Sequence, residues 1–472
     1  MSSFSSINTA LSGLLSHRRA LDVIGHNIAN ASTEGFSRRR VEMSPAGNQV
    51  VPSMFAKASA TGTGVKIDGI SRIRDEFLES RALREHGNLG RLSTEASTLG
   101  RLELTVPEPS DVGLSAQLGD FYAAWDDVAN SPGDSAGRIA VLQQASTVAS
   151  SLQRISADMR GMRSSSLSEA VTMVAEINST AARIAELNDG VARANAAGLD
   201  PHDLADQRDR LIMSLSDLAG VEVRPSRFGS VDVTLGGTSL VRGSTSEQLK
   251  VAEPDPLGGA FVGTGLDRVE IQWATDGYPA SASGGKLGGL VRSLNEHIPR
   301  ALTELDAVAG ALVVSVNALH TAGQGLDAVA DVNLSFWDPT GTTASTIRLS
   351  ADVVDQPSRI AAASVGAGAL DATVAQRIAA LHNSSTGADA LYRDMIGRLA
   401  VETQAATRRV SIQGEVTYQA DDARLSVSGV NLDEELASLI TTQRSYEAAA
   451  RLLTTIDQAL DTLINRTGLV GR

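Results

Sequence analysis

Each end of this chain carries a narrow stripe of apolar residues repeated at helical spacing. At the N-terminus the apolar residues follow alternating steps of three and four, and Arg18 and Gly25 occupy the two heptad positions that are skipped. The stripe consists of Phe4, Ile7, Leu11, Leu14, Leu21 and Ile28. This period is typical of a helix packed lengthwise against another helix. The sequence therefore predicts an amphipathic N-terminal helix that ends near Asn30.

A matching stripe occupies the C-terminal segment from Asn431 to about Asn465. It consists of Leu432, Leu436, Leu439, Tyr446, Leu453, Ile456, Leu460 and Leu463. Asp433, Glu434 and Glu435 would lie in the first helical turn, where carboxylates offset the helix dipole. Both stripes are too narrow to be buried fully in one copy, and isolated helices are marginal in water. They could pair with each other, with neighbouring copies, or with both.

The chain between these ends is long enough for two or three domains, because the whole has 472 residues. Helical periodicity prevails, but residues after Gly220 alternate apolar and polar side chains around glycine turns, which indicates strands. The predicted fold class is mainly α with a smaller β domain. The predicted parts are paired terminal helices that form a coiled-coil-like layer (1–40 and 428–472), a discontinuous helical middle domain (41–220, 284–327 and 356–427) and an inserted outer β domain (221–283 and 328–355).

Composition excludes several classes of function. The formal charge of −14 argues against nucleic-acid binding, which needs a basic surface. The chain has no cysteine, so disulfides, thiolate nucleophiles and cysteine-ligated metal centres are excluded. No signal peptide is visible, and the longest apolar stretch, 307–316, is too short to cross a bilayer. We therefore expect no membrane insertion, and export would require a dedicated apparatus.

No catalytic or metal-binding motif stands out, so we expect neither an enzyme nor a cofactor. The seven histidines form no H-E-x-x-H pair and no recognisable catalytic group with Ser or Asp. The strongest metal-like cluster consists of Asp200, His202, Asp203, Asp206 and Asp209. Because Asp206 and Arg210 are four residues apart, a solvated helix face with this ion pair is favoured over a metal site.

Two further motifs have competing interpretations. The run Gly284-Gly-Lys-Leu-Gly-Gly superficially suggests a phosphate loop, but Leu287 follows the lysine and the glycine spacing is wrong, so a hinge between the β domain and a helix is favoured. The basic run Arg38-Arg39-Arg40 is either a solvated loop or a contact with an acidic surface on a neighbouring subunit. The sequence leaves these two interpretations of the basic run open.

The stretch Asn27-Ile-Ala-Asn-Ala-Ser-Thr-Glu-Gly-Phe-Ser-Arg resembles the N-terminal signature of the axial proteins of the bacterial flagellum. Phe36 stands where Tyr is common, and Glu34 stands where Pro is frequent. Asn30, Thr33 and Gly35 supply helix capping and a positive-φ turn, which fix the exit of the helix. Three further segments are similar to those of hook-associated proteins at the hook–filament junction: Asp203-Leu-Ala-Asp-Gln-Arg-Asp-Arg-Leu, Gly285-Lys-Leu-Gly-Gly-Leu, and Ser428-Gly-Val-Asn-Leu with Thr442-Gln-Arg-Ser-Tyr-Glu-Ala.

This resemblance implies a structural component of the flagellum that forms the junction between hook and filament. It implies unfolded export through the flagellar type III apparatus, an extracellular location, and a cytoplasmic chaperone at the C-terminal region. The implied partners are copies of the chain in a ring or tube layer, hook protein on one side and hook-associated protein 3 on the other. The expected assembly interface consists of the N-terminal stripe, Asn30, Thr33, Gly35, and Leu436, Leu439, Tyr446, Leu453 and Leu460. The alternatives are another axial protein of the rod or hook, or a cytoplasmic coiled-coil scaffold.

Overall fold

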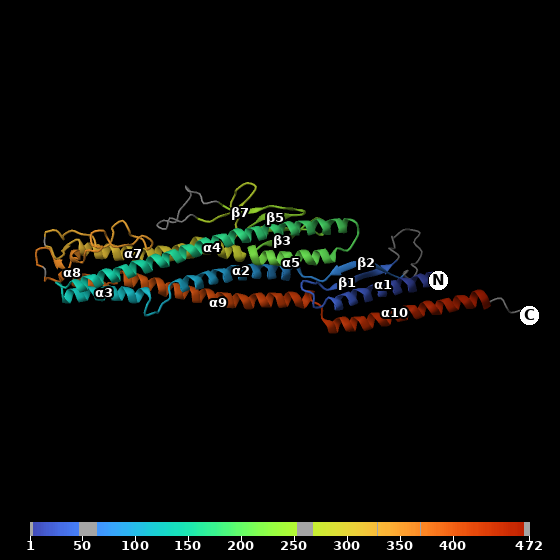
Figure 1. The fold of residues 1–472 in the computed structure, drawn as a ribbon. Coiled ribbons are helices and arrows are strands. Elements are labelled where there is room, and N and C mark those ends of the chain that lie inside the picture. The colour runs from blue at the N-terminus through green and yellow to red at the C-terminus, as the bar shows by residue number, and fades with distance from the viewer. Residues whose placement is uncertain (1–2, 47–63, 253–267, 328, 369, 467–472) are drawn as a thin grey trace, which may run out of the picture.

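Two long helices, α1 (Ser3–Ala29) and α10 (Leu432–Asp461), lie side by side at one end of an elongated molecule (Figure 1). The computed structural model describes residues 3–46, 64–252, 268–327, 329–368 and 370–466. The remaining described helices form a long body on one side of this terminal helix pair. A short bend at residues 429–431 connects the body to α10.

The helices α1 and α10 run antiparallel with a constant stagger. The Asn27 side-chain amide donates a hydrogen bond of 3.1 Å to Glu435 at one end of the pair. Nearer the other end, a Cβ built on Gly13 would lie 3.9 Å from the Ala449 Cβ. Between these contacts α1 goes back from 27 to 13 and α10 advances from 435 to 449, fourteen residues on each. Because fourteen residues are two heptads, the pair keeps the register of a coiled coil.

A β-hairpin follows α1 and packs against it. Its strands β1 (Arg39–Ala46) and β2 (Gly64–Arg72) are antiparallel, and Arg39 is paired with Arg72. The sequence analysis assigned residues 41–220 to the helical domain, and the structure differs at this first part. Half-buried and exposed side chains alternate from Val65 to Asp68, as is typical of a strand.

The body is a bundle of helices, and prolines mark its first two breaks. Pro107 and Pro109 lie between α2 and α3, and Pro132 lies between α3 and α4. The helices are α2 (Glu76–Thr105), α3 (Leu114–Asn130), α4 (Ser135–Ala196), α5 (His202–Ala219), α6 (Gly285–Arg292), α7 (Ile298–His320), α8 (Thr373–Ala379) and α9 (Ala388–Ser428). Short 3₁₀ or π turns lie at η1 (Arg227–Gly229), η2 (Ser293–His297), η3 (Pro357–Arg359), η4 (Ala380–Asn383) and η5 (Thr462–Arg466).

Two hydrophobic cores lie one after the other along the body, and the 62-residue helix α4 contributes to both. The inner core, nearer the joint with α1 and α10, takes Leu83 from α2 and otherwise only residues between Ala170 and Leu294. The outer core is built from residues 99–159 and 298–406. In the sequence, the residues of the inner core, apart from Leu83, therefore lie between the two segments that form the outer core.

A small set of strands covers the inner core. The strands β3 (Glu222–Pro225), β4 (Val231–Leu235), β5 (Thr238–Arg242) and β6 (Thr245–Ser246) form one antiparallel sheet, and β7 (Leu249–Val251) pairs with β8 (Ile271–Trp273). Strand residues such as Val233 and Leu240 are fully buried in the inner core. The mainly α class with a smaller β region is thus confirmed.

Residues 328–355 differ from the expectation that they belong to the β domain. The described residues of this segment form only isolated bridges, Val332 with Gln324 and Trp337 with Leu349, and contain no strand of two or more residues. Phe336 and Trp337 are completely buried in the outer core with the helices. The segment follows the shape of that core because burial of large aromatic side chains outweighs strand pairing here. The nearby strands β9 (Gly323–Gln324) and β10 (Ala363–Ser364) form a separate short pair.

The helical run from Gly285 to His320 is long and apolar enough to cross a membrane by length and composition alone. In this structure its apolar side chains fill the two cores instead. Leu287, Leu290 and Leu294 belong to the inner core, and seven residues from Leu302 to Val316 belong to the outer core. These core positions account for the buried apolar residues of the run.

The glycines of α2 give a matched test of helix packing. A Cβ on Gly90 would lie 2.4 Å from the carbonyl oxygen of Asp217 and 3.2 Å from the amide nitrogen of Lys286, whereas a Cβ on Gly100 would meet nothing within 4 Å. We expect Gly90→Ala to lower the free energy of unfolding by about 1–3 kcal/mol through overpacking. Gly100→Ala should raise it by up to about 1 kcal/mol through helix propensity. Urea titrations followed by circular dichroism would measure both, and equal losses would contradict this packing.

His320 makes the outer core sensitive to acid. The ring is fully buried; its Nδ1 lies 2.7 Å from the Leu334 carbonyl oxygen, and the Ala361 amide donates to its Nε2 at 2.9 Å. Burial lowers the pKa of His320 from 6.5 to about 4. Because the unfolded chain takes up the proton first, the free energy of unfolding should fall by about 3 kcal/mol as the pH drops from about 6.5 to about 4.

Urea titrations across this pH range would test the prediction for His320. The variant His320→Gln should lose most of the difference between neutral and acidic conditions, because no imidazole is left to be protonated. An unchanged pH dependence in this variant would assign the acid sensitivity to other groups.

Candidate functional site

The terminal helix pair carries two sets of apolar side chains that differ in burial. The first set lies along the seam between the helices and is half-buried; from α1 it has Ile7, Leu14, Leu21 and Ile28, and from α10 it has Leu439, Tyr446, Leu453 and Leu460. Members of each group are seven residues apart, so they follow one line along their helix. The side chain of Phe4, also expected at the interface, lies outside the described residues.

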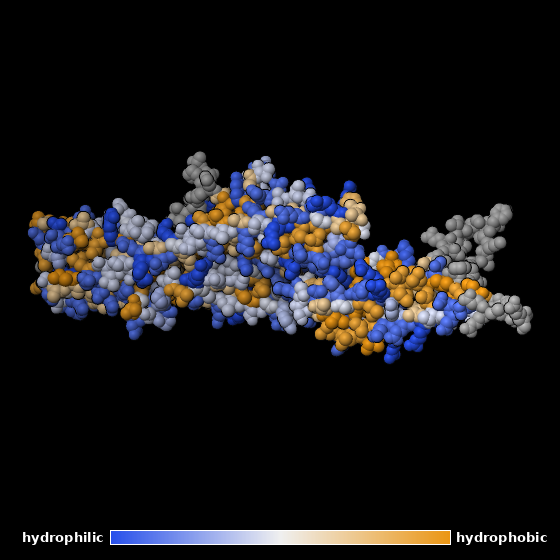
Figure 2. All heavy atoms as spheres, turned by 45° about the vertical axis from the view of Figure 1, so that its right-hand side comes forward, coloured by the Kyte–Doolittle hydropathy of each residue, from blue (hydrophilic) through white to orange (hydrophobic). Residues whose placement is uncertain are grey.

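The second set of apolar side chains is exposed on the outside of the pair. Leu11 and Leu436, which the sequence analysis placed with the seam, are 43% and 49% exposed. The other members are Leu15, Ile440, Leu452, Leu463 and Ile464. Leu432 is 48% exposed as well, but it lies seven residues before Leu439, on the line of the seam. Figure 2 shows apolar side chains gathered over the terminal helix pair, on the right of the view. We call this exposed set the outer stripe. In α10 only Glu435 is buried, so most of this helix surface is open to a partner.

The turn after α1 is ordered by its own side chains. The Asn30 amide donates to the carbonyl oxygen of His26 at 2.9 Å, and the Thr33 hydroxyl donates to Asn30 Oδ1 at 3.2 Å. Gly35 has a φ of +73°, in the left-handed region that favours glycine. A Cβ there would also lie 2.2 Å from the side chain of Arg210. The three turn residues expected at the site therefore shape the connection between α1 and the hairpin.

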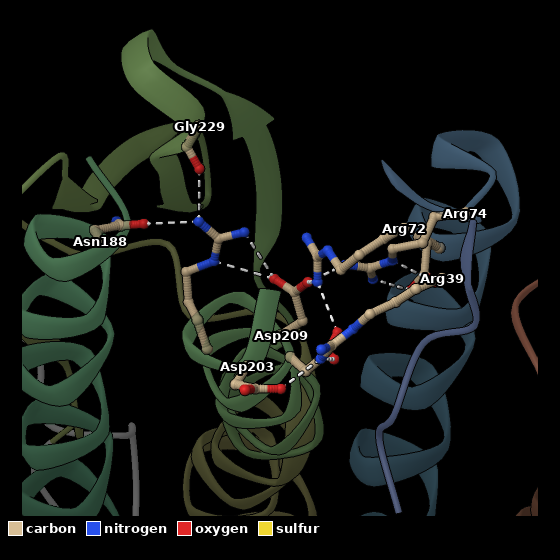
Figure 3. Close-up of polar contacts among 10 residues, drawn as sticks. Arg39, Arg72, Arg74, Asn188, Asp203, Asp209 and Gly229 are labelled. Atoms are coloured by element: carbon tan, nitrogen blue, oxygen red, sulfur yellow. Dashed lines mark hydrogen bonds and ion pairs between the residues drawn. The ribbon is translucent and has the colours of Figure 1, made fainter. Parts of the chain in front are cut away.

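A network of arginines and aspartates joins the hairpin to the body (Figure 3). Arg39 contacts Asp203 at 2.5 Å and Asp206 at 3.1 Å. Arg72 contacts Asp206 at 2.9 Å and Asp209 at 2.8 Å. Arg74 also pairs with Asp209. The three aspartates are three residues apart on α5, so they face the hairpin together. We call these six residues the joint network.

The joint network is partly shielded from solvent, which strengthens its ion pairs. The side chain of Asp206 is 8% exposed, whereas that of Asp203 is 72% exposed although both bind Arg39. Bonding to Arg39 lowers the pKa of Asp203 below its ordinary value. Arg208 binds Asp209 at 3.0 Å and also donates to the Gly229 carbonyl oxygen and to Asn188. Burial lowers the pKa of Arg208 to about 10.

A second set of ion pairs joins α10 to the start of the hairpin. Arg38 contacts Glu435 at 2.7 Å and Glu434 at 2.8 Å. Glu435 also accepts a hydrogen bond from Asn27, whose amide donates in turn to the carbonyl oxygen of Arg39 at 2.9 Å. These contacts fix the first turn of α10 against the last turn of α1.

The structure corrects the sequence interpretation of this region. The proposed surface pair of Asp206 and Arg210 is wrong, because Asp206 is bound by Arg39 and Arg72 and the Arg210 side chain lies against Gly35. Arg38 and Arg39 bind carboxylates of their own chain, so neither interpretation of the basic run describes them. The described residues contain no group of three or more acidic or histidine side chains placed to hold a metal ion.

A cavity of about 680 Å³ lies beside these contacts. The turn 31–37 forms one wall, and the opposite walls include Asp217 of α5 and Asp421 near the end of α9. His86 of α2 also faces the cavity. The cavity therefore lies where the terminal helix pair, the hairpin and the body meet.

Three sequence families match the chain. Residues 99–335, half of its length, match the flagellar hook-associated protein FlgK helical domain. Residues 7–36 match the flagella basal body rod protein family, and residues 422–466 match the C-terminal family of the flagellar basal body rod proteins FlgEFG. The last two matches coincide with α1 and its turn, and with the end of α9 and α10.

Characterised proteins of several bacteria are similar along most of the chain. Flagellar hook-associated protein 1 of Bacillus subtilis is 28% identical, and the alignment covers both chains completely. The protein of that name from Escherichia coli is 24% identical over 97% of this chain and 99% of its own. The one from Salmonella typhimurium is 27% identical over 74% of this chain and 63% of its own. The solved structure of the flagellar hook junction protein FlgK from Burkholderia pseudomallei is 28% identical, with a TM-score of 0.46, over 56% of this chain and 46% of that one.

Proposed function

Since this chain belongs to the family of flagellar hook-associated protein 1, we propose that its copies form the junction between flagellar hook and filament, on which the filament assembles. It is a structural component of the flagellum. The observation that carries the assembly mechanism is the terminal helix pair, which uses one apolar line for its own seam and leaves the outer stripe uncovered. Exposed apolar surface of this kind marks an interaction site.

The outer stripe is the proposed contact between neighbouring copies. Leu11 and Leu15 on α1, and Leu436 and Ile440 on α10, are each about half exposed, which is unusual for large apolar side chains on two adjacent helices. A neighbouring copy would remove this surface from water and supply the free energy that the narrow seam lacks. Contact between different faces of successive copies produces a ring or a helical tube.

The joint network has a mechanical role in this proposal. A tube of terminal helices can position the bodies around it only if each body is fixed to its own helices. Arg39 and Arg72 bind α5 of the body, and Arg38 binds α10, so the hairpin is attached on both sides. Three arginines that each bind two carboxylates form a network, which holds an orientation better than a single ion pair does.

Partners and location follow from the family and extend the proposal. We propose hook protein on one side of the junction and hook-associated protein 3 on the other, with a cytoplasmic export chaperone on the C-terminal region. The chain would be secreted unfolded through the flagellar export apparatus and act outside the cell. A purely structural role without enzymatic activity is part of the same proposal.

Deletion of the gene tests the proposed function. Electron microscopy of the deletion strain should show hooks without filaments, and the filament subunit should accumulate in the medium. Missing hooks would instead indicate a rod or hook component. Normal filaments would contradict the junction role and favour a cytoplasmic coiled-coil scaffold.

A further inference from the structure

His86 joins three helices of the body at the side of the cavity. The residue lies on α2; its ring Nδ1 is 2.9 Å from Asp217 Oδ1 on α5, and its Nε2 is 2.9 Å from Asp421 Oδ2 on α9. Asp421 lies two turns before Ser428, the last residue of α9. The carbonyl oxygen of Ser428 accepts a hydrogen bond from the Arg38 amide at 2.9 Å, so this end of α9 is also the base from which α10 departs.

The two contacts of His86 determine the protonation state of the ring. An ionised carboxylate can only accept hydrogen bonds, so both ring nitrogens must donate, and a ring that donates from both nitrogens is the imidazolium cation. Bonding to Asp217, and secondarily to Asp421, outweighs burial and raises the pKa of His86 above 6.5. A neutral ring could donate to only one of the two aspartates.

The charged surroundings of His86 come from each element that meets at the cavity. Asp217 is contributed by α5, and Asp421 by α9 with Arg424 beside it at 3.5 Å. The remaining charged groups that line the cavity are Glu34 of the turn, Arg74 and Glu79 at the start of α2, and Asp209 and Arg210 of α5. The side chain of His86 is 21% exposed, so protons can reach it from solvent.

We propose that protonated His86 is an ionic lock that holds the end of α9 against α2 and α5, and that loss of its proton in alkaline solution releases this end. Without the proton, two carboxylates face a neutral ring that can satisfy one of them. When the neutral ring keeps its bond to Asp217, the end of α9 loses its polar attachment to α2 at this point, and the direction in which α10 leaves the body becomes less restricted. Such a lock acts within one copy of the chain.

The pH range of the lock follows from the direction of the pKa shift. A group whose pKa is higher in the closed state stabilises that state fully below 6.5, and the stabilisation is lost as the pH rises through the raised pKa. Between pH 6.5 and the raised pKa of His86, the equilibrium constant for opening should increase up to about tenfold for each pH unit.

The protonation state can be tested by NMR on the full chain labelled with ¹⁵N-histidine. The two ring nitrogens of one histidine should keep the imidazolium pattern above pH 6.5, and this signal should be absent from His86→Gln. A midpoint at or below 6.5 for His86 would overturn the proposal. Asp421→Asn, which keeps the ring but removes one carboxylate, should lower the midpoint, and this variant serves if His86→Gln does not fold.

Hydrogen exchange tests the release of α9. Amides of residues 421–428 in the wild-type chain should lose protection as the pH passes the midpoint, after correction for the intrinsic pH dependence of exchange. In Asp421→Asn this loss should begin at lower pH, and in His17→Gln, which changes a histidine on α1, it should match the wild type. A raised midpoint without any change in protection of α9 would show that His86 is charged but locks nothing.

Discussion

A chain with Leu453→Asp is expected to leave α1 and α10 unpaired and to produce no filaments. Leu453 lies in the half-buried seam, and an ionised carboxylate there would have to leave water without a charged partner. The body should still fold, because its two cores contain no residue of α10. Hydrogen exchange of residues 3–29 would measure the pairing, and electron microscopy of complemented cells would measure filament formation.

A substitution at the neighbouring residue, Leu452, distinguishes an effect on the pairing of α1 and α10 from an effect on assembly between copies. Leu452 is 49% exposed on the outer stripe, so Leu452→Asp should leave the terminal helix pair protected and still prevent filaments. Val171, 53% exposed on α4 of the body, provides the matched control, and Val171→Asp should leave both pairing and filaments unchanged. Filaments of normal length from the Leu452 variant would show that the outer stripe is not part of the assembly interface.

Replacing Asp206 by alanine should lower the free energy of unfolding by about 1.5–3 kcal/mol. This buried carboxylate binds both Arg39 and Arg72, and its loss leaves each of these poorly exposed guanidinium groups with one carboxylate of the joint network instead of two. Thermal and urea unfolding of the purified chain would measure the loss. The terminal helices should also become more accessible to protease, because the hairpin would be held less firmly to α5.

Asp203 supplies the control on the same face of α5. It binds the same Arg39 at a shorter distance but is 72% exposed, so Asp203→Ala should cost less than about 1 kcal/mol. If the two alanine variants lost the same stability, burial would not determine the strength of the joint network.

The helices at the two ends could be predicted because their determinants are local. The seven-residue spacing of Leu439, Tyr446 and Leu453 is visible in the sequence, and Asn431 caps the helix that begins at Leu432. The apolar pattern could not divide these residues between seam and outer stripe. Leu436 and Leu439 are both leucines of one stripe, and only the position of α1 makes the first exposed and the second half-buried.

The joint network could not be predicted because its partners are far apart in the sequence. Arg39 and Asp206 are separated by 167 residues, and Arg72 and Asp209 by 137. The available local partner, Arg210, is at the favourable helical spacing from Asp206, but the arginines of the hairpin displace it. The regular spacing of Asp203, Asp206 and Asp209 was the one visible sign that this face of α5 meets a basic surface.

The positions of the two cores in the sequence predict the order in which the parts of the chain can fold. Apart from Leu83, the inner core draws on one uninterrupted stretch, whereas the outer core must wait for residues 298–406. The hydrogen bond between Asn27 and Glu435 closes a loop of 408 residues. Because loop closure costs more entropy as loops lengthen, the pairing of the two ends should come last. A chain truncated before α10 should therefore have a folded body but lack the terminal helix pair through which copies would assemble.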